Sequence, residues 1–374
     1  MRFFSLILTA LLYCQVAFGQ GPEIKWWNPA QADFPAVMGQ AWPSEVQSTY
    51  HRLPARAEKE VRKPVWKLSR ESAGLSIRFH TNASDIRVRY KLKGPVALRH
   101  MPSTGVSGLD LFAKSADGEW LRCWGSYSIG ADSRFNFVIN EKSRKYEKRG
   151  REYRLFLPLY NEVDSLVIGV SAEADFRPIP AKMEKPIVAY GTSICQGACV
   201  SRPGMTWTNI LERQLDRPMV NLGFSGNGRL EPELIELIGE IEASLYILDC
   251  LPNLKPKSDD TEALAIAAVK RLRELRPDTP IILTEHIGYA DGETNRKSKE
   301  KYISLNKALR KAYKHLKRKG YTKVYLLSKT ELGLGIESYV DTIHPNDHGM
   351  LQYADAYEKL IRKALVQEGQ SPSL

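Results

Sequence analysis

The stretch Pro186-Ile-Val-Ala-Tyr-Gly-Thr-Ser-Ile-Cys-Gln-Gly197 decides the fold of this chain. Its apolar run, residues 187–190, is typical of a fully buried β-strand, and Gly191 ends that run shortly before Ser193. In open α/β sheets, reactive groups gather just beyond the carboxyl ends of the strands. Ser193 therefore stands where a nucleophile is expected, although a lone serine at such a position more often only caps a helix.

The chain after Pro186 alternates between strand-like and helix-like patterns. Repeated β–α units of this kind predict a parallel sheet that is covered by helices on both faces. We therefore expect an α/β fold, a flavodoxin-like three-layer αβα domain, over residues 186–368. Strands are predicted at residues 187–190, 218–222, 245–249, 280–284 and 323–327, and helices near residues 205–215, 231–240, 259–275, 297–319 and 347–366.

The preceding part, residues 22–180, contains short strand-like runs that are separated by turn residues. In one of them, residues 84–91, apolar and basic side chains alternate with the period of a half-buried strand. Such runs predict an all-β sandwich or jelly-roll domain. Residues 177–186 contain three prolines and are the expected linker between the two domains.

A second polar element, Asp341-Thr-Ile-His344, precedes the last predicted helix. A carboxylate three residues before a histidine can turn back and hold one nitrogen of the imidazole ring. The other ring nitrogen can then face a serine hydroxyl as a general base. We therefore predict that Ser193, His344 and Asp341 form a catalytic triad, in which Asp341 orients the histidine.

Two further polar groups follow predicted strands. Gly223 closes the segment Asn221-Leu-Gly223, and Asn253 comes soon after the strand at residues 245–249. A backbone N–H of glycine and a side-chain amide are suitable donors for the oxyanion of a tetrahedral intermediate. We therefore expect the oxyanion hole to consist of Gly223, Asn253 and the N–H of Ser193.

This order of Ser, Gly, Asn and Asp-x-x-His resembles the SGNH (GDSL-like) hydrolase superfamily. Gly191-Thr-Ser193 is similar to the Gly-Asp-Ser block, with threonine in place of aspartate, and Leu251-Pro-Asn253 keeps only the asparagine of the usual Gly-x-Asn-Asp. Gly108-Leu-Asp-Leu-Phe112 looks like the Gly-x-Asp-Leu-Tyr signature of an N-terminal β domain in a bacterial subgroup, with Phe112 in place of tyrosine. The resemblance covers nearly all of the mature chain.

The resemblance implies a serine esterase that works through an acyl-enzyme and needs no metal or organic cofactor. It also implies carbohydrate substrates from which small acyl groups, most simply acetyl, are removed. The expected partner is thus an acylated carbohydrate or another small ester. Two alternatives remain open: a lysophospholipase or thioesterase that acts on longer acyl chains, and a non-catalytic glycan-binding protein. Because some related esterases use a Ser–His pair alone, the need for Asp341 is also open.

Three other residues are candidates for the site. His286 follows the predicted strand at 280–284 and could line the substrate pocket, or serve only the local structure. Asp110 lies in a turn-rich segment that could form the wall facing the catalytic domain, or could stabilise a local turn. Cys195 is a rival nucleophile, less favoured than Ser193 because it falls within the first turn of the following helix.

The first residues indicate export. Residues 1–19 combine Arg2, an apolar core at residues 3–16 and a small-x-small cleavage site at residues 17–19, which is typical of a cleaved signal peptide. We therefore expect a secreted or periplasmic protein. No other segment has the roughly 18 consecutive apolar residues of a membrane-spanning helix, so no membrane span is expected.

The net charge of +11 is concentrated in residues 142–154 and 296–319. Export argues against a nucleic-acid partner, and solvated charge on an amphipathic helix explains the second segment. Export also permits disulfides among Cys123, Cys195, Cys199 and Cys250, with Cys199–Cys250 as one possible pair. The chain has no Cys-x-x-Cys pair, so no metal site is expected. The sequence predicts no particular oligomeric state.

Overall fold

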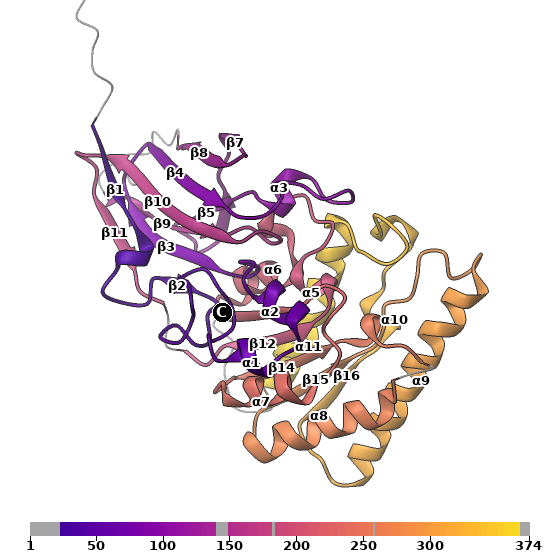
Figure 1. Ribbon diagram of the computed structural model, residues 1–374. Helices are drawn as coiled ribbons and strands as arrows, with labels where there is room; N and C mark the ends of the chain where they lie inside the picture. The colour runs from indigo at the N-terminus through magenta and orange to yellow at the C-terminus, as the bar shows by residue number, and fades with distance from the viewer. Residues whose placement is uncertain (1–22, 140–148, 182–183, 257–258, 367–374) are drawn as a thin grey trace, which may run out of the picture.

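A computed structural model describes residues 23–139, 149–181, 184–256 and 259–366. The expected signal peptide, residues 1–19, lies outside the described residues, as does most of the basic segment that begins at residue 142. The described part contains an antiparallel β-sandwich followed by an α/β domain (Figure 1). No helix within these ranges combines the length and the apolar character that a membrane crossing needs.

The α/β domain is built on one parallel sheet with the strand order β13-β12-β14-β15-β16. This is the flavodoxin-like order, in which the first strand lies between the second and the third. The register aligns Gly191, the last residue of β12, with Gly223 on one side and with Asp249 on the other. The strands are β12 (Ile187–Gly191), β13 (Met219–Gly223), β14 (Leu245–Asp249), β15 (Ile281–Thr284) and β16 (Val324–Leu327).

Helices cover both faces of this sheet, which confirms the predicted three-layer α/β fold. Alternate strand residues explain the two cores: Val188 and Tyr190 pack with α7, α8 and α9, whereas Ile187 and Ala189 pack with α6 and α11. The helices of this domain are α5 (Ser193–Gln196), α6 (Trp207–Leu215), α7 (Pro232–Glu240), α8 (Thr261–Leu275), α9 (Arg296–Arg318), α10 (Lys329–Leu332) and α11 (Asp347–Val366).

The N-terminal part forms two facing antiparallel sheets, in agreement with the predicted sandwich. One sheet has the order β1-β10-β4-β8-β7 and the other has the order β11-β3-β9-β5-β6, with β2 beside β3. An apolar core that includes Phe79, Val88 and Leu155 fills the space between them. The strands are β1 (Ile24–Trp27), β2 (Val37–Met38), β3 (Ser76–Thr81), β4 (Asp85–Leu92), β5 (Asp110–Lys114), β6 (Trp120–Arg122), β7 (Gly125–Ser128), β8 (Asp132–Val138), β9 (Arg151–Phe156), β10 (Val163–Ser171) and β11 (Phe176–Ile179).

One N-terminal segment packs against the α/β domain instead of the sandwich. It contains α1 (Ala57–Glu60) and α2 (Lys63–Ser69), which lie beside β12 in Figure 1. Leu53, Val65 and Trp66 share one apolar cluster with residues of β13 and α7. Neither helix was predicted from the sequence, because both are short and neither has a side-chain cap. The two domains are thus joined by a shared apolar cluster as well as by the linker.

Candidate active site

Ser193 occupies the first position of α5, directly beyond the carboxyl end of the central strand β12. Thr192 caps this helix by accepting a hydrogen bond from the N–H of Ile194 at 3.3 Å. The N–H of Ser193 belongs to the first helical turn and has no partner within the helix. Ser193 is 8% exposed, so its hydroxyl is held in a mostly buried environment with limited access to solvent.

The three residues of the predicted triad meet in the structure. Ser193 Oγ lies 2.8 Å from His344 Nε2, although 151 positions separate the two residues. His344 Nδ1 lies 2.7 Å from Asp341 Oδ2. Since an ionised carboxylate only accepts hydrogen bonds, Nδ1 carries the ring proton and Nε2 presents its lone pair to the serine hydroxyl. This is the arrangement that general-base activation of a serine requires.

Asp341 also shapes the loop that holds the histidine. Its Oδ1 accepts hydrogen bonds from the backbone N–H groups of Ile343 and His344, both at 2.8 Å. Partial burial raises the pKa of Asp341, but the hydrogen bonds from the His344 ring and from these two N–H groups outweigh it, so the pKa lies below its ordinary value. Asp341 is therefore ionised when it faces the imidazole.

Asn253 lies beside the loop that follows β13, whereas Gly223 does not have the free N–H expected of an oxyanion donor. Asn253 ends the short 3-10 helix after β14, and its Nδ2 donates a long hydrogen bond of 3.4 Å to Phe224 O. The N–H of Gly223 donates to Asn221 Oδ1 at 2.9 Å. A side chain at position 223 would lie 2.2 Å from the backbone nitrogen of Gln196. Gly223 is thus a close-packing residue, which corrects the sequence-based prediction.

The loop after β13 offers another N–H in place of Gly223. From Phe224 to Arg229, every other backbone N–H donates to an acceptor within the described residues. The exception is Gly226, which has φ of +68° and faces open space, since a Cβ at this position would meet no atom within 4 Å. Phe224, whose carbonyl oxygen accepts the hydrogen bond from Asn253, lies two residues before Gly226. Residues 223–228 contain three glycines, at 223, 226 and 228, and the pattern alone did not distinguish them.

Asp110 is a structural residue between the domains and does not line a substrate pocket. Its side chain is 2% exposed. Its Oδ2 accepts hydrogen bonds from Arg202 and, at 3.1 Å, from the N–H of Gly204 in the α/β domain. Its Oδ1 accepts from Arg122 at 3.3 Å. These hydrogen bonds occupy both carboxylate oxygens. Asp110 therefore joins the sandwich to the loop before α6.

His286 is likewise buried and cannot contact a substrate in this conformation. It is 0% exposed, and its Nδ1 accepts a hydrogen bond from the N–H of Gly288 at 2.9 Å. Burial, followed by the nearby charges of Lys301 and Lys329, lowers the pKa of His286 to about 3. The neutral ring therefore packs under Tyr289 as part of the core, which corrects the prediction of a pocket residue.

His100 is a residue near the triad that the sequence alone did not single out. Its exposed ring stacks on the ring of His344, with centroids 5.9 Å apart and planes inclined by 26°. The ring stands on a tight turn that is closed by two hydrogen bonds between the backbones of Leu98 and Met101, at 3.2 and 3.1 Å. Behind the turn, Met101 is buried in the core of the α/β domain. The β-sandwich thus contributes one wall of the site.

The four cysteines in the described residues are all free thiols, so the Cys199–Cys250 pair is not formed. Cys250 Sγ instead lies 3.7 Å from Tyr190 O in the core. Cys195 is fully buried, and burial, with the neighbouring Asp249, raises the pKa of its thiol well above the ordinary value. A buried, protonated thiol cannot compete with Ser193 as the nucleophile.

One group of residues in the described part of the chain has the spacing of metal ligands. Potential ligand atoms of Cys199, Asp341 and His344 lie within 4.8 Å of one another. Both nitrogens of the His344 ring already have partners, Ser193 and Asp341. An ion at this place would have to displace one of those hydrogen bonds. The donor set therefore fits a hydrogen-bonded triad better than a resident metal site.

A serine, histidine and aspartate beyond the strand ends of a three-layer α/β sheet define a serine hydrolase. Family comparisons agree: residues 184–362 match the GDSL-like lipase/acylhydrolase family, and residues 24–176 match the N-terminus of SGNH-hydro-type esterases. The chain therefore belongs to the GDSL-like, or SGNH, acylhydrolase family, and carries the N-terminal domain of its esterases. No match is found among curated protein sequences.

Solved structures resemble this one over nearly the whole chain. A protein from Bacteroides ovatus ATCC 8483 described as a GDSL-like lipase is 33% identical, with a TM-score of 0.83 over 92% of this chain and 98% of that chain. The salicylyl-acyltransferase SsfX3 of a tetracycline biosynthetic pathway is 20% identical, with a TM-score of 0.72 over 93% and 98%. An acetyl xylan esterase from the rumen bacterium Butyrivibrio proteoclasticus is 11% identical, with a TM-score of 0.51 over 93% and 100%. The last two likenesses concern the fold alone.

Proposed function

We propose that this protein is a secreted or periplasmic serine esterase that removes small acyl groups, most simply acetyl, from carbohydrates. The observation that carries the proposal is the continuous chain of hydrogen bonds from Ser193 Oγ through His344 to Asp341. It provides a nucleophile, a general base and an ionised orienting group in one place. The membership of the GDSL-like acylhydrolase family supports ester hydrolysis by these groups.

The reaction follows from this geometry. Ser193 Oγ forms a bond to the ester carbonyl carbon while its proton passes to His344 Nε2. The resulting oxyanion accepts hydrogen bonds from the N–H groups of Ser193 and Gly226 and from the Asn253 amide. When the intermediate collapses, the C–O bond breaks and His344 gives the proton to the leaving alcohol. A water molecule, deprotonated by His344, then hydrolyses the acyl-enzyme and releases the acid.

Two independent features support a carbohydrate substrate. Among the similar folds is an acetyl xylan esterase. The signal-peptide pattern at residues 1–19 would place the enzyme outside the cytoplasm, where polysaccharides are met. The open alternative is an enzyme for longer acyl chains, and acyl transfer to an alcohol in place of water would use the same acyl-enzyme.

The test compares substrates and a nucleophile variant. The protein should hydrolyse p-nitrophenyl acetate faster than p-nitrophenyl octanoate and should release acetate from an acetylated polysaccharide. Ser193→Ala should reduce kcat by at least about 10³-fold, because removal of the nucleophile of a triad leaves only residual catalysis. Ser201→Ala, which changes a nearby exposed serine, is the matched control. Unchanged activity in Ser193→Ala would refute the mechanism, and a preference for octanoate would refute the small-acyl assignment.

A further inference from the structure

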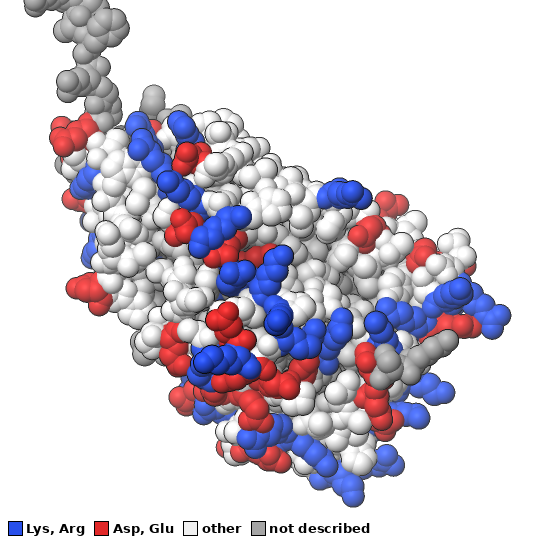
Figure 2. Space-filling model, in the orientation of Figure 1, with Lys and Arg blue, Asp and Glu red and all other residues white. Residues whose placement is uncertain are grey.

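The outer face of the β-sandwich carries an unusual row of cations. On β4, Ile86, Val88 and Tyr90 point into the core, so the residues between them face solvent. We define the arginine face as the outward residues Arg87, Arg89 and Lys91 of β4 together with Arg134 of β8. Figure 2 shows Lys and Arg side chains gathered over the part of the molecule where Figure 1 places β4 and β10.

Two of these cations stand directly opposite each other. The register of the antiparallel pair aligns Arg89 with Arg134, and both side chains are exposed. Like charges at directly opposite positions destabilise a sheet. Within the described ranges, no carboxylate forms an ion pair with either guanidinium group. The fold therefore keeps two cations that repel each other, although a neutral residue at either position would remove the repulsion.

The other two cations have weak carboxylate partners. Arg87 pairs with Asp85 at 3.0 Å, and Lys91 pairs with Asp132 at 3.9 Å between two largely exposed side chains. Exposed ion pairs of this kind contribute little and are screened by salt. The centre of the arginine face, at Arg89 and Arg134, thus keeps an excess of positive charge.

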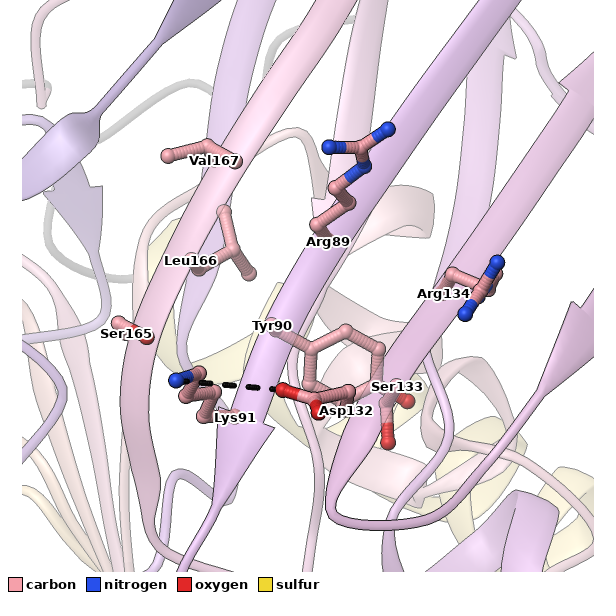
Figure 3. A pocket seen from close by; sticks show the side chains of 9 residues that line it. All are labelled: Arg89, Tyr90, Lys91, Asp132, Ser133, Arg134, Ser165, Leu166 and Val167. Carbon is pink, nitrogen blue, oxygen red and sulfur yellow. Dashed lines mark ion pairs between the residues drawn. The ribbon is translucent and has the colours of Figure 1, made fainter.

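The arginine face is hollowed on both sides of this centre. One hollow of about 500 Å³ is lined by both central arginines and extends to Lys91 and Ser165. Figure 3 shows the guanidinium groups of Arg89 and Arg134 on neighbouring strands, with the Lys91–Asp132 pair farther along the hollow. A second hollow of about 390 Å³ shares the same two arginines and continues along β7 and β8. Because they share Arg89 and Arg134, the two hollows together make one elongated groove across β10, β4, β8 and β7.

An aromatic ring forms part of the same surface. Trp26 of β1 is aligned with Gly169 of β10, and its ring covers this glycine so closely that a Cβ there would come within 2.7 Å of the ring. The guanidinium of Arg89 lies over this ring, 4.4 Å from the ring centroid. The indole is still 37% exposed. A guanidinium held by an aromatic ring is already positioned, which lowers the entropy lost when it binds an anion.

We propose that the arginine face binds an acidic polysaccharide, with the carboxylates of uronic acid units paired to Arg89 and Arg134. Guanidinium groups match carboxylates with two parallel hydrogen bonds. The hydroxyls of Ser165 on β10 and of Ser126 and Ser128 on β7 lie on the two sides of the arginines and suit sugar hydroxyls. The elongated groove fits a chain of sugars better than a flat lipid surface. This inference goes beyond the proposed esterase function. Binding of the polymer does not depend on that function; only the expectation that the bound polymer carries an ester rests on it.

The test measures binding apart from catalysis. Ser193→Ala in the full chain is titrated with polygalacturonate by calorimetry and affinity electrophoresis at low salt. We expect Arg89→Ser with Arg134→Ser to weaken binding at least tenfold. The matched control, Lys311→Ser with Lys314→Ser on α9, removes the same charge elsewhere and should leave binding unchanged. Neutral xylan should not bind.

Several outcomes would overturn the proposal. Equal loss of binding in the arginine and lysine variants would mean that net charge alone attracts the polymer. Stronger retention of dextran sulfate, which carries no carboxylates, of double-stranded DNA or of phosphatidylglycerol vesicles through the same arginines would assign the face to another anion. Thermal unfolding checks that the double variant is folded, and we expect its Tm to be equal to or above that of the parent. The double variant that retains Ser193 should hydrolyse p-nitrophenyl acetate at an unchanged rate. The binding proposal and the esterase mechanism are therefore tested separately, and one can fail while the other holds.

Discussion

Arg52 donates a hydrogen bond from Nη1 to the carbonyl oxygen of Gly223 at 2.8 Å, across 171 positions of sequence. The same side chain also donates to the carbonyl oxygens of Asn221, Leu68 and Glu71, at 3.1, 2.6 and 2.7 Å. Arg52 is 1% exposed. A guanidinium from the segment between β2 and β3 thus fixes the end of β13, from which the loop with Gly226 departs.

We expect Arg52→Met to destabilise the protein by about 3 kcal/mol or more, because it leaves four buried carbonyl groups without their charged donor. Urea unfolding measures the free energy. Arg62→Met is the matched control, since Arg62 is partly exposed and pairs with Glu231 at the surface, where loss of the pair should cost under about 1 kcal/mol. Equal effects of the two substitutions would show that Arg52 does not fix the strand end.

Asp341→Asn should reduce kcat by about 10²- to 10⁴-fold. An amide nitrogen facing Nδ1 would favour the wrong tautomer of His344, with its proton toward Ser193. The activity is measured with p-nitrophenyl acetate. Asp347→Asn, which alters a carboxylate bonded to Ser201, should keep most of the activity. A loss of less than tenfold in Asp341→Asn would identify a Ser–His dyad in place of a triad.

Asn253→Ala tests the oxyanion hole. Removing one donor of this kind costs about 10²- to 10³-fold in kcat, with little change in KM, because the hydrogen bond strengthens only in the transition state. Asn227→Ala is the control on the neighbouring loop, where the side chain contacts Arg62 and Ser225. If Asn253→Ala changed KM and left kcat intact, the amide would bind the substrate and would not stabilise the oxyanion.

The sequence predicted the α/β domain well because its signals are local. Each buried strand is a short apolar run and each helix has an apolar stripe, so the predicted strand at residues 245–249 coincides with β14. The polar residues at the strand ends followed from the same logic, since the carboxyl ends of parallel strands share one edge. The sequence alone could therefore predict that Ser193 and His344 meet, as they do in the structure, whereas the role of Asn253 stays a prediction.

What the sequence could not predict depends on long-range contacts. Gly223 and Gly226 look alike in the sequence, but the fold gives the N–H of Gly223 an acceptor and packs its Cα against Gln196, whereas it leaves Gly226 open. Asp110 and His286 were predicted as pocket residues because the sequence does not show whether a polar side chain is buried. His100 reaches the site only because its turn, in another domain, docks beside His344.

His100→Ala should impair large substrates more than small ones. His100 is exposed and stacks on His344, so we expect its ring to contact the alcohol part of a large ester and its loss to raise KM several-fold for an acetylated oligosaccharide. For p-nitrophenyl acetate, kcat and KM should change little. His100→Gln, which keeps a planar polar group, should restore part of the affinity, and His315→Ala on α9 is the control. Equal effects on both substrates would mean that His100 acts only by positioning His344.

Protonation of Asp249 in the folded state should make the free energy of unfolding decrease as the pH rises. Burial raises the pKa of Asp249 to about 7, although hydrogen bonds from Tyr353 and Tyr357 oppose the increase. The folded state then keeps a proton that the unfolded chain, with a pKa of about 3.9, releases. Between about pH 4 and pH 7 the free energy of unfolding therefore falls, by up to about 1.4 kcal/mol per pH unit from this group.

Asp249→Asn isolates this contribution, because Glu71 is buried as well and its pKa is also raised to about 7. Asparagine carries no titrating proton, so the variant should lose less stability than the parent between pH 5 and pH 8, whatever its absolute stability. Urea unfolding of both proteins over this range gives the difference, and Asp355→Asn on α11 should follow the parent. Parallel curves for Asp249→Asn and the parent would mean that Asp249 is already ionised at pH 5, and that its contact with Tyr353 Oη, at 2.8 Å, stabilises the charged form.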